Sequence, residues 1–196
     1  MKKNWNLLQR IGLLLVAVSC VLLLGSRVLA CWNGRAVENL VAQMKAVLPE
    51  ITEGDPENYS DTAMPVLQLE GKDFSGLIQV PAFGVSLPMG SSWGRGTVYR
   101  YPCRFWGSVY DHSLIAGGSG RKGQFDFCSR LDLGEKILVT DMTGVRFSYE
   151  VTGIDRRNHA DMEVFREKDS DLILFTQDSA SQSYLIVRCS FAPYAQ

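Results

Sequence analysis

From Val66 onward, the sequence consists of short apolar segments separated by turn-forming residues. Leu77–Val80 lies between a glycine and a proline, and Val85–Leu87 ends at Pro88. Short apolar runs bounded by Gly and Pro are typical of strands, because glycine and proline interrupt regular structure at both ends. The pattern predicts a mainly β domain that forms a closed barrel or a sandwich.

The rest of the domain continues this pattern. A hairpin is expected where Lys136–Asp141 and Val145–Val151 are separated by three turn-forming residues. A short helix is expected where Phe125, Cys128 and Leu131 recur at every third position. Further strands are expected at 113–116, 172–176 and 184–189.

An apolar run near the N-terminus follows three basic residues. Lys2, Lys3 and Arg10 precede an uncharged stretch over 11–26, and Arg27 interrupts the apolar character that continues to residue 32. A membrane-spanning helix needs about 20 mostly apolar residues, and flanking basic residues favour the cytoplasmic side. We expect a single-pass cell-membrane protein with a transmembrane helix over about 7–30, a cytoplasmic N-terminus and an extracytoplasmic domain.

Two alternatives to an uncleaved anchor remain at this stage. Val28-Leu29-Ala30 is similar to the small-residue cleavage site of a signal peptide. With Cys31, the same residues resemble a lipoprotein processing site. All three interpretations place the rest of the chain outside the cytoplasmic membrane.

A helix is expected between this run and the β domain. Apolar residues of Arg35–Leu48 follow helical spacing, and Pro49 ends the pattern. A stalk that packs on the domain is favoured over a dimerising coiled coil, because about two heptads are too few. The polar stretch 50–65 indicates a linker. The expected organisation is a cytoplasmic tip and anchor over 1–31, stalk and linker over 32–65, and a barrel domain over 66–196.

Composition excludes several classes of function. The net charge is −1 and the charges are interspersed, whereas a nucleic-acid surface needs clustered Lys and Arg. The domain holds three cysteines, and an odd number is not typical of a disulfide framework.

The cysteines also do not indicate a metal site. Without C-x-x-C spacing we expect no metal site, and we expect no cofactor. Cys103 and Cys189 either pair or stay buried thiols, and Cys128 is interpreted as a small apolar core residue.

The order of the segments resembles the sortase family, the cell-wall transpeptidases of Gram-positive bacteria. Gly76–Pro81 resembles the family's opening G-x-I-x-I-P strand, Leu114–Gly117 its I-A-G-H strand, and Leu172–Thr176 its L-T-L-x-T-C strand. Pro102-Cys103-Arg104 and Val187-Arg188-Cys189 resemble a class-B-like branch found in Firmicutes. The resemblance covers about 76–191 and implies a closed β-barrel. Further matches are Val85–Met89, Phe125–Glu135, Ile137–Asp141, Phe147–Val151 and Tyr184–Cys189.

The resemblance also implies three catalytic positions, and none of them holds the family's residue. Sortases use a cysteine nucleophile, a histidine acid/base and an arginine. The matching positions here are Gln177, Gly118 and Tyr184. Because a neutral amide cannot form a thioacyl link, the resemblance implies a sortase homologue that is inactive in transpeptidation.

Four kinds of substitute residue are considered. Arg188 shares a strand face with Tyr184 but lies about 13 Å along the strand. His159, in a long polar connection over 155–170, is a candidate relocated acid/base. His112 begins a strand about 20 Å from Gly118 and is interpreted as a turn or surface residue. The loop hydroxyls have no evident base beside them; they are Ser179, Ser181 and Ser183.

Two other chemistries are weighed and disfavoured. Asp141 and Asp155 show no paired-carboxylate arrangement of the kind a glycosidase needs. Gly117–Gly120, followed by Arg121-Lys122-Gly123, is a glycine-rich stretch after a strand. It lacks the spacing of a phosphate-binding loop, so a flexible loop near the vacated groove is favoured.

Three function hypotheses follow. The first is an inactive sortase homologue that binds a sorting-signal peptide, a pilin or other surface protein, or an active sortase. The second is a cysteine-independent sortase-like transpeptidase or hydrolase with relocated residues, through His159 or a loop serine. The third is an unrelated extracytoplasmic β domain. The loss of both Cys and His favours the first over the second, and the ordered series of matched segments disfavours the third.

Overall fold

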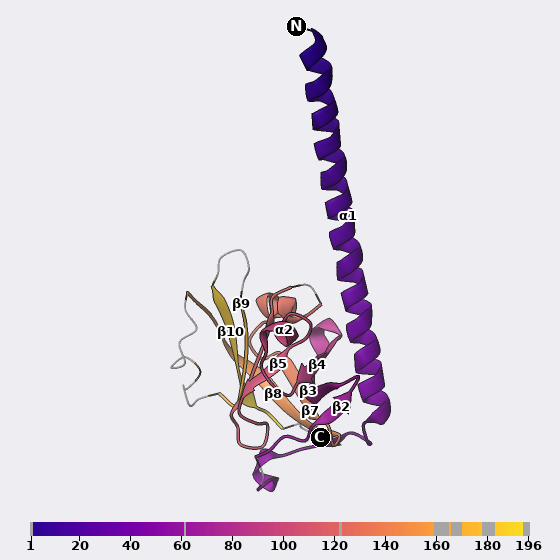
Figure 1. Cartoon of the computed structure of the whole chain (residues 1–196). Helices are drawn as coiled ribbons and strands as arrows, with labels where there is room; N and C mark the ends of the chain where they lie inside the picture. Colours follow the sequence, from indigo (N-terminus) through magenta and orange to yellow (C-terminus); the bar gives the residue numbers. More distant parts are fainter. Residues whose placement is uncertain are drawn as a thin grey trace. The chain divides into compact units, whose positions relative to one another are not determined.

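The computed structural model describes residues 2–60, 62–121, 123–158, 165, 170–177 and 183–193 (Figure 1). The chain divides into two units, 1–36 and 37–196. The first contains most of helix α1 (Lys2–Val47), and the second contains its last turns and all the strands. The two units are described separately.

The prediction of a single-pass membrane protein is wrong for the part of the chain that the structure describes. No helix there is both long enough and apolar enough to cross a membrane.

The last turns of α1 pack on the β domain, as expected of the stalk helix. Leu40, Val41 and Met44 are buried in one cluster with Phe74 and Leu77. Their three- and four-residue spacing places all three side chains on one helix face. The helix does not begin at Arg35 as expected, since α1 runs without a break from residue 2.

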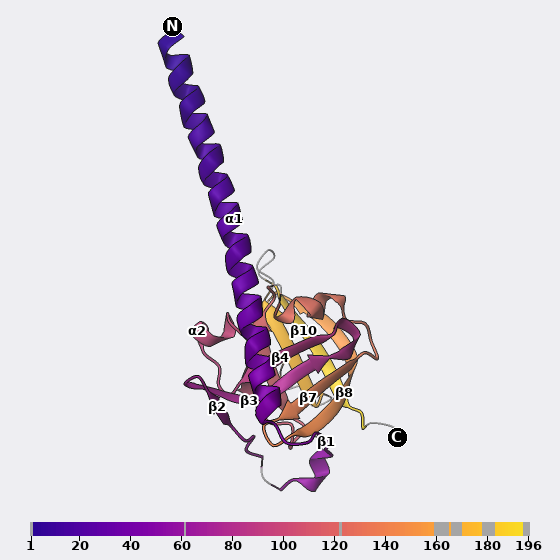
Figure 2. The ribbon, with the colours of Figure 1, turned by 90° about the vertical axis from the view of Figure 1, so that its right-hand side faces the viewer.

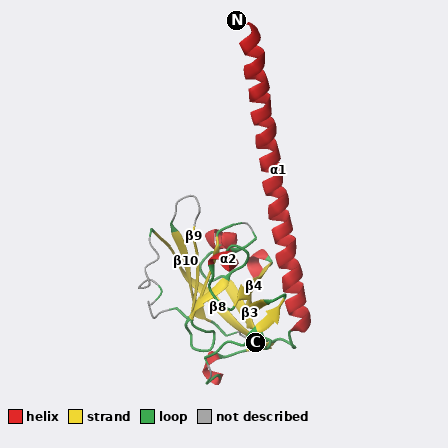
Figure 3. Cartoon of the chain, viewed as in Figure 1, coloured by secondary structure: helices red, strands yellow, loops and turns green. Residues whose placement is uncertain are grey.

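Among the described residues, strands β3 to β10 close into a barrel (Figures 2 and 3). The order is β8-β10-β9-β6-β5-β4-β3-β7, and β7 pairs with β8 to complete the ring. The predicted mainly β closed barrel with short helices is confirmed. The barrel strands are β3 (Lys72–Val80), β4 (Val85–Gly90), β5 (Cys103–Trp106), β6 (Leu114–Ser119), β7 (Lys136–Asp141), β8 (Val145–Arg157), β9 (Leu172–Gln177) and β10 (Tyr184–Phe191).

Smaller elements flank the barrel. Two short strands extend the sheet beside β8 and β3. They are β1 (Thr52–Glu53) and β2 (Leu67–Leu69). Four single-turn or short helices complete the described elements: η1 (Pro56–Asn58), η2 (Pro81–Phe83), α2 (Arg95–Val98) and η3 (Phe125–Arg130). The stretch expected as a linker over 50–65 therefore contains β1 and η1.

A buried carboxylate holds the turn between β7 and β8. Asp141 is fully buried, and its Oδ1 accepts hydrogen bonds from the Thr143 N–H and hydroxyl, both at 2.8 Å, and from the Val145 N–H at 2.9 Å. Its Oδ2 accepts a hydrogen bond from the Tyr110 hydroxyl. The four donors compensate for the burial of the carboxylate, and they account for Asp141 as a structural residue.

We expect Asp141→Asn to lower the free energy of unfolding by about 2–4 kcal/mol, because an amide nitrogen replaces one acceptor in a saturated buried site. Chemical denaturation of the full chain measures this loss. Asp73→Asn is the matched control, since Asp73 is exposed and accepts one surface hydrogen bond from Gln68. Equal losses in the two variants would contradict the assigned role.

Candidate functional site

The parallel pair β6–β9 forms the centre of the candidate site. Six residue pairs join the strands in register, from Leu114↔Leu172 to Ser119↔Gln177. Gly118 is paired with Thr176, one position before Gln177. The prediction that the strands ending near Gly117 and Thr176 lie side by side is confirmed, and the two ends are about one strand spacing of 4.8 Å apart.

Strands β10 and β8 continue this arrangement on the far side of β9. Tyr184 is paired with Gln177 on β9 and with Arg157 on β8. Ser119, Gln177, Tyr184 and Arg157 therefore form one row across four strands, which we call the outer row. The three positions implied by the resemblance lie at the same end of the barrel.

The neighbouring row faces the barrel interior, because side chains alternate between the two faces of a strand. It consists of Gly118, Thr176, Leu185 and Arg156, and we call it the inner row. Leu185 belongs to the barrel core, and this shows that the inner row is on the interior face of the sheet. Gln177 and Gly118 thus lie on opposite faces, and the residue that shares the face of Gln177 on β6 is Ser119.

Packing favours a glycine at position 118. A Cβ placed there would lie 2.9 Å from a ring carbon of Phe125. Phe125 is itself buried in the barrel core. A histidine at this position therefore requires Phe125 to move, since overpacking of a filled core is destabilising.

Four aromatic rings lie on the outer face next to the outer row. Trp93 stacks on Phe175 with centroids 5.3 Å apart, and its edge-on contact with Phe105 measures 5.4 Å. Phe165 contacts Phe175 at 5.0 Å. We call Trp93, Phe105, Phe165 and Phe175 the aromatic cluster. The cluster forms an apolar surface next to the outer row, which we call the apolar floor. The sequence pattern did not indicate it, because the four residues lie in separate loops and strands.

Because Gly117 has no side chain, two rings of the aromatic cluster can pack against its backbone. A Cβ at Gly117 would lie 2.3 Å from Trp93 and 2.4 Å from Phe175. The glycine-rich stretch thus continues β6 through Ser119 and accommodates aromatic rings. Gly117, Gly118 and Ser119 therefore belong to a strand, and they form neither a phosphate-binding loop nor a flexible loop.

Arg188 does not join the outer row. It pairs with Ile173 and Gly153, four residues from Tyr184 along β10. Its Nε atom donates to Oδ2 of Asp155 at 3.2 Å. We therefore interpret Arg188 and Asp155 as structural residues that link β10 to β8. His159, Ser179 and Ser181 lie outside the described residues, and Ser183 is buried directly before β10.

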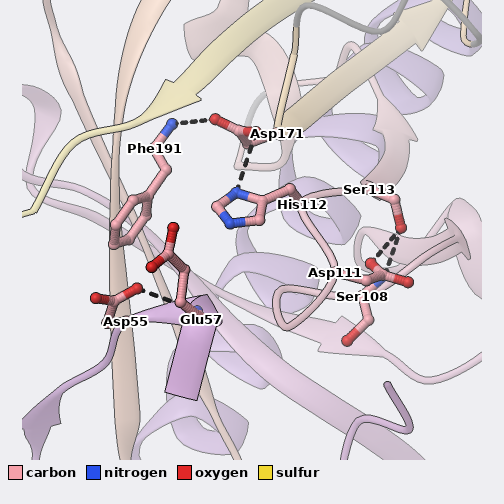
Figure 4. Close-up of polar contacts among 8 residues, drawn as sticks. All are labelled: Asp55, Glu57, Ser108, Asp111, His112, Ser113, Asp171 and Phe191. Atoms are coloured by element: carbon pink, nitrogen blue, oxygen red, sulfur yellow. Dashed lines mark hydrogen bonds and ion pairs between the residues drawn. The ribbon is translucent and has the colours of Figure 1, made fainter. Parts of the chain in front are cut away.

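His112 lies before β6, at the end of that strand opposite to Ser119. Figure 4 shows its contact with Asp171. Its Nδ1 atom is 3.1 Å from Oδ1 of Asp171, and Oδ2 of Asp171 accepts the Phe191 N–H at 2.6 Å. The φ angle of His112 is +55°, which is typical of a tight turn. Ser113 donates to Asp111 rather than to the imidazole. The interpretation of His112 as a turn residue is confirmed.

The three cysteines of the β domain are buried free thiols. Cys103 packs in the cluster under α1, whereas Cys128 and Cys189 lie in the barrel core, so Cys103 and Cys189 are not paired. Burial raises the pKa of the Cys103 thiol to about 12, and burial also raises the pKa values of the Cys128 and Cys189 thiols. Because the thiolate is the reactive form, none of the three is a nucleophile at neutral pH.

The described ranges contain no group of three or more His, Cys, Asp or Glu residues arranged to hold a metal ion. The outer row offers a hydroxyl, an amide, a phenol and a guanidinium. These groups can donate or accept hydrogen bonds. Such a set can form hydrogen bonds with peptide groups and with polar side chains.

Comparison with known proteins identifies the fold. No family model and no curated protein sequence matches the chain. Solved structures do match, among them sortase A from Corynebacterium diphtheriae, a lid mutant. It is 18% identical with a TM-score of 0.56, and the match covers 63% of this chain and 73% of that chain.

Two sortase C structures are also similar. Sortase C-1 from Actinomyces oris is 20% identical over 61% of this chain and 72% of that one, with a TM-score of 0.53. Sortase C from Clostridium perfringens, solved with its C-terminal cell wall sorting motif, is 15% identical over 63% and 72%, with a TM-score of 0.55. The β domain therefore has the sortase fold. Its likeness to class B stays a prediction.

We expect Gly117→Ala to lower the free energy of unfolding by about 1–3 kcal/mol, because the added methyl group overlaps the rings of Trp93 and Phe175. Near-UV circular dichroism should report the displaced indole, and denaturant titration the lost stability. Gly96→Ala is the control, since a Cβ at Gly96 meets no atom within 4 Å. An unchanged near-UV spectrum in Gly117→Ala would contradict the assigned packing.

Proposed function

We propose that this chain is a sortase-family protein that binds a peptide across the outer row and does not transfer it. The observation that carries the proposal is the position of Gln177. It lies exposed at the end of β9, in register with Ser119 and Tyr184, at the position that the resemblance assigns to the nucleophile. A carboxamide there can hold a peptide group but cannot form an acyl intermediate.

The surrounding chemistry supports binding without transfer. The three thiols of the β domain are buried and have raised pKa values, and His112 lies at the other end of the barrel. The outer row therefore pairs hydrogen-bonding groups with the apolar floor of the aromatic cluster. A few placed polar groups over an apolar floor are typical of specific peptide sites.

The proposed occupant is a sorting-signal peptide, carried by a surface protein such as a pilin, or presented together with an active sortase. The support is the likeness to the Clostridium perfringens sortase C, whose structure holds its C-terminal cell wall sorting motif. The alternative, an enzyme with relocated residues at His159 or a loop serine, is an outcome of the tests below.

Binding is tested on the full chain with a sorting-signal peptide, using calorimetry for affinity and intact-protein mass spectrometry for covalent capture. We expect saturable binding and no added mass. Gln177→Ala should weaken binding about 3–10-fold, the equivalent of about one hydrogen bond. His112→Ala should leave the affinity unchanged. Equal affinity in Gln177→Ala and the parent would contradict the proposed site.

A second test introduces the cysteine, histidine and arginine that sortases use. It asks whether their absence explains why we expect no peptide transfer. Gln177→Cys alone should keep a thiol pKa near its ordinary value of about 8.5, as measured by the pH dependence of alkylation, because neither of its register neighbours, Ser119 and Tyr184, is a cation that could stabilise the thiolate. Adding Ser119→His and Tyr184→Arg places both groups on the same face as the thiol. This triple variant should show a lowered thiol pKa and slow peptide cleavage.

The matched triple variant carries Gly118→His in place of Ser119→His. It should lower the thiol pKa less than the variant with Ser119→His does, because only the arginine at position 184 shares the face of the thiol, whereas position 118 faces the barrel interior against Phe125. Turnover by the unmodified protein, removed by His159→Ala or by changes at Ser179 or Ser181, would establish the relocated enzyme instead.

A further inference from the structure

An exposed arginine lies at or beside each end of the outer row. Arg157 is the last residue of the row, at the end of β8, and its side chain is exposed. At the other end, Arg121 follows Ser119 by two positions and is also exposed. Two residues of chain span at most about 7 Å, so Arg121 belongs to the Ser119 end of the row.

Neither arginine has a carboxylate partner among the residues that the structure describes. Asp155 shares the outer face of β8 with Arg157, but its Oδ2 atom is already paired with Nε of Arg188 at 3.2 Å. The guanidinium of Arg121 lies over the ring of Tyr99, 5.5 Å from the ring centroid. A contact with an aromatic face orients a guanidinium and leaves it charged. Both positive charges can therefore pair with a ligand.

Gln124 holds Tyr99 and Arg121 beside the outer row. Its Oε1 atom accepts a hydrogen bond from the Ser119 N–H at 3.1 Å, and its Nε2 atom donates to the Tyr99 carbonyl oxygen at 2.7 Å. Gln124 is buried, so this link between β6 and the residue that follows α2 is shielded from water. The position of the Arg121 charge near Ser119 is thus fixed by a buried residue.

The chain that carries this end of the site is poor in acidic residues. Between Asp73 and Asp126 the sequence has five basic residues and one acidic residue, Asp111. Asp111 lies before β6, at the end of that strand opposite to Ser119. The same interval contributes two rings of the aromatic cluster, so the apolar floor lies in a stretch with surplus positive charge. Such a surface favours an anionic partner.

We propose that the outer row selects an acidic peptide, in which two carboxylate side chains stand four residues apart with an apolar residue midway between them. This inference rests on the proposed peptide binding. The row crosses three strand spacings, about 14 Å, and an extended peptide advances about 3.3 Å per residue. Residues i and i+4 of a peptide that crosses the strands therefore lie about 13 Å apart, and they point to the same side as residue i+2.

This spacing matches the arrangement of groups on the surface. One carboxylate pairs with Arg157 and the other with Arg121, and both pairs are charge-assisted hydrogen bonds. Between them, the side chain of residue i+2 reaches the apolar floor, where Trp93 is 40% exposed. The hydrogen-bonding groups of Gln177 and Tyr184 lie under the peptide backbone.

The test uses a five-residue peptide, Glu-Ala-Phe-Ala-Glu, with both ends blocked so that only its side chains are charged. Its counterparts carry Gln or Lys in place of both Glu residues, and a further peptide, Glu-Glu-Ala-Phe-Ala, has the same composition with adjacent carboxylates. Calorimetry and NMR titration of the full chain measure the affinities. We expect the Glu peptide to bind about tenfold tighter than the Gln peptide, and at least about threefold tighter than the peptide with adjacent carboxylates.

Salt should reduce this preference. Exposed charges are screened within about 3 Å at 1 M ionic strength, so the advantage of the Glu peptide over the Gln peptide should fall to about twofold or less there. Stronger binding of the Lys peptide than of the Glu peptide would overturn the proposal.

Matched variants locate the two charges. Arg157→Gln and Arg121→Gln should each weaken binding of the Glu peptide about three- to fivefold and leave the affinity for the Gln peptide within about twofold. Arg146→Gln is the control, because Arg146 lies at the other end of β8 and pairs with Glu53. Arg157→Glu should reverse the preference, binding a peptide with one of the two Glu residues changed to Lys more tightly than the Glu peptide. Unchanged affinity for the Glu peptide in both Gln variants would overturn the proposal.

The outcomes separate this inference from the proposed function. Equal affinities for the Glu and Gln peptides, with NMR shifts at Ser119, Gln177 and Tyr184, would overturn the selection for acidic peptides and leave the peptide site intact. Saturable binding of the sorting-signal peptide without binding of the Glu peptide would have the same meaning. Failure of all the peptides to bind would overturn both.

Discussion

The in-register parallel pairing of β6 with β9 is the interaction on which the site depends. It places Ser119 beside Gln177 on one face and Gly118 beside Thr176 on the other. Because side chains alternate along a strand, a shift of one residue would exchange the two faces. The outer row and the inner row are therefore two consequences of one register, and β10 extends both rows through its pairing with β9.

Small residues at the end of β6 allow aromatic rings to fill both faces of this pair. Gly117 admits Trp93 and Phe175 on the outside, and Gly118 admits Phe125 on the inside. The close-packed rings stabilise this end of the barrel, and Gln177 stays exposed beside them. This packing supports the proposal that the site holds a ligand without forming a covalent bond with it.

Much of the fold could be predicted from local patterns, and much of the site could not. Turn residues between alternating apolar segments located the hairpin of β7 and β8, but β8 continues to Arg157 through polar residues because it pairs with β10. The sequence order of strand ends brought Gly118 and Gln177 to one place, whereas their opposite faces depend on register. The contacts of Phe105 with Trp93 and with Phe165 also require the folded barrel. The anchor was inferred from composition alone and is not supported by the described helix.

The central claim is that the outer row binds a peptide without becoming acylated. The most direct measurement is an NMR titration of the full chain with a sorting-signal peptide, followed by intact-mass analysis of the same sample. The account predicts saturable shifts at Ser119, Gln177 and Tyr184, with the protein mass unchanged. Shifts confined to other parts of the barrel, or a protein mass increased by an acyl fragment, would contradict it.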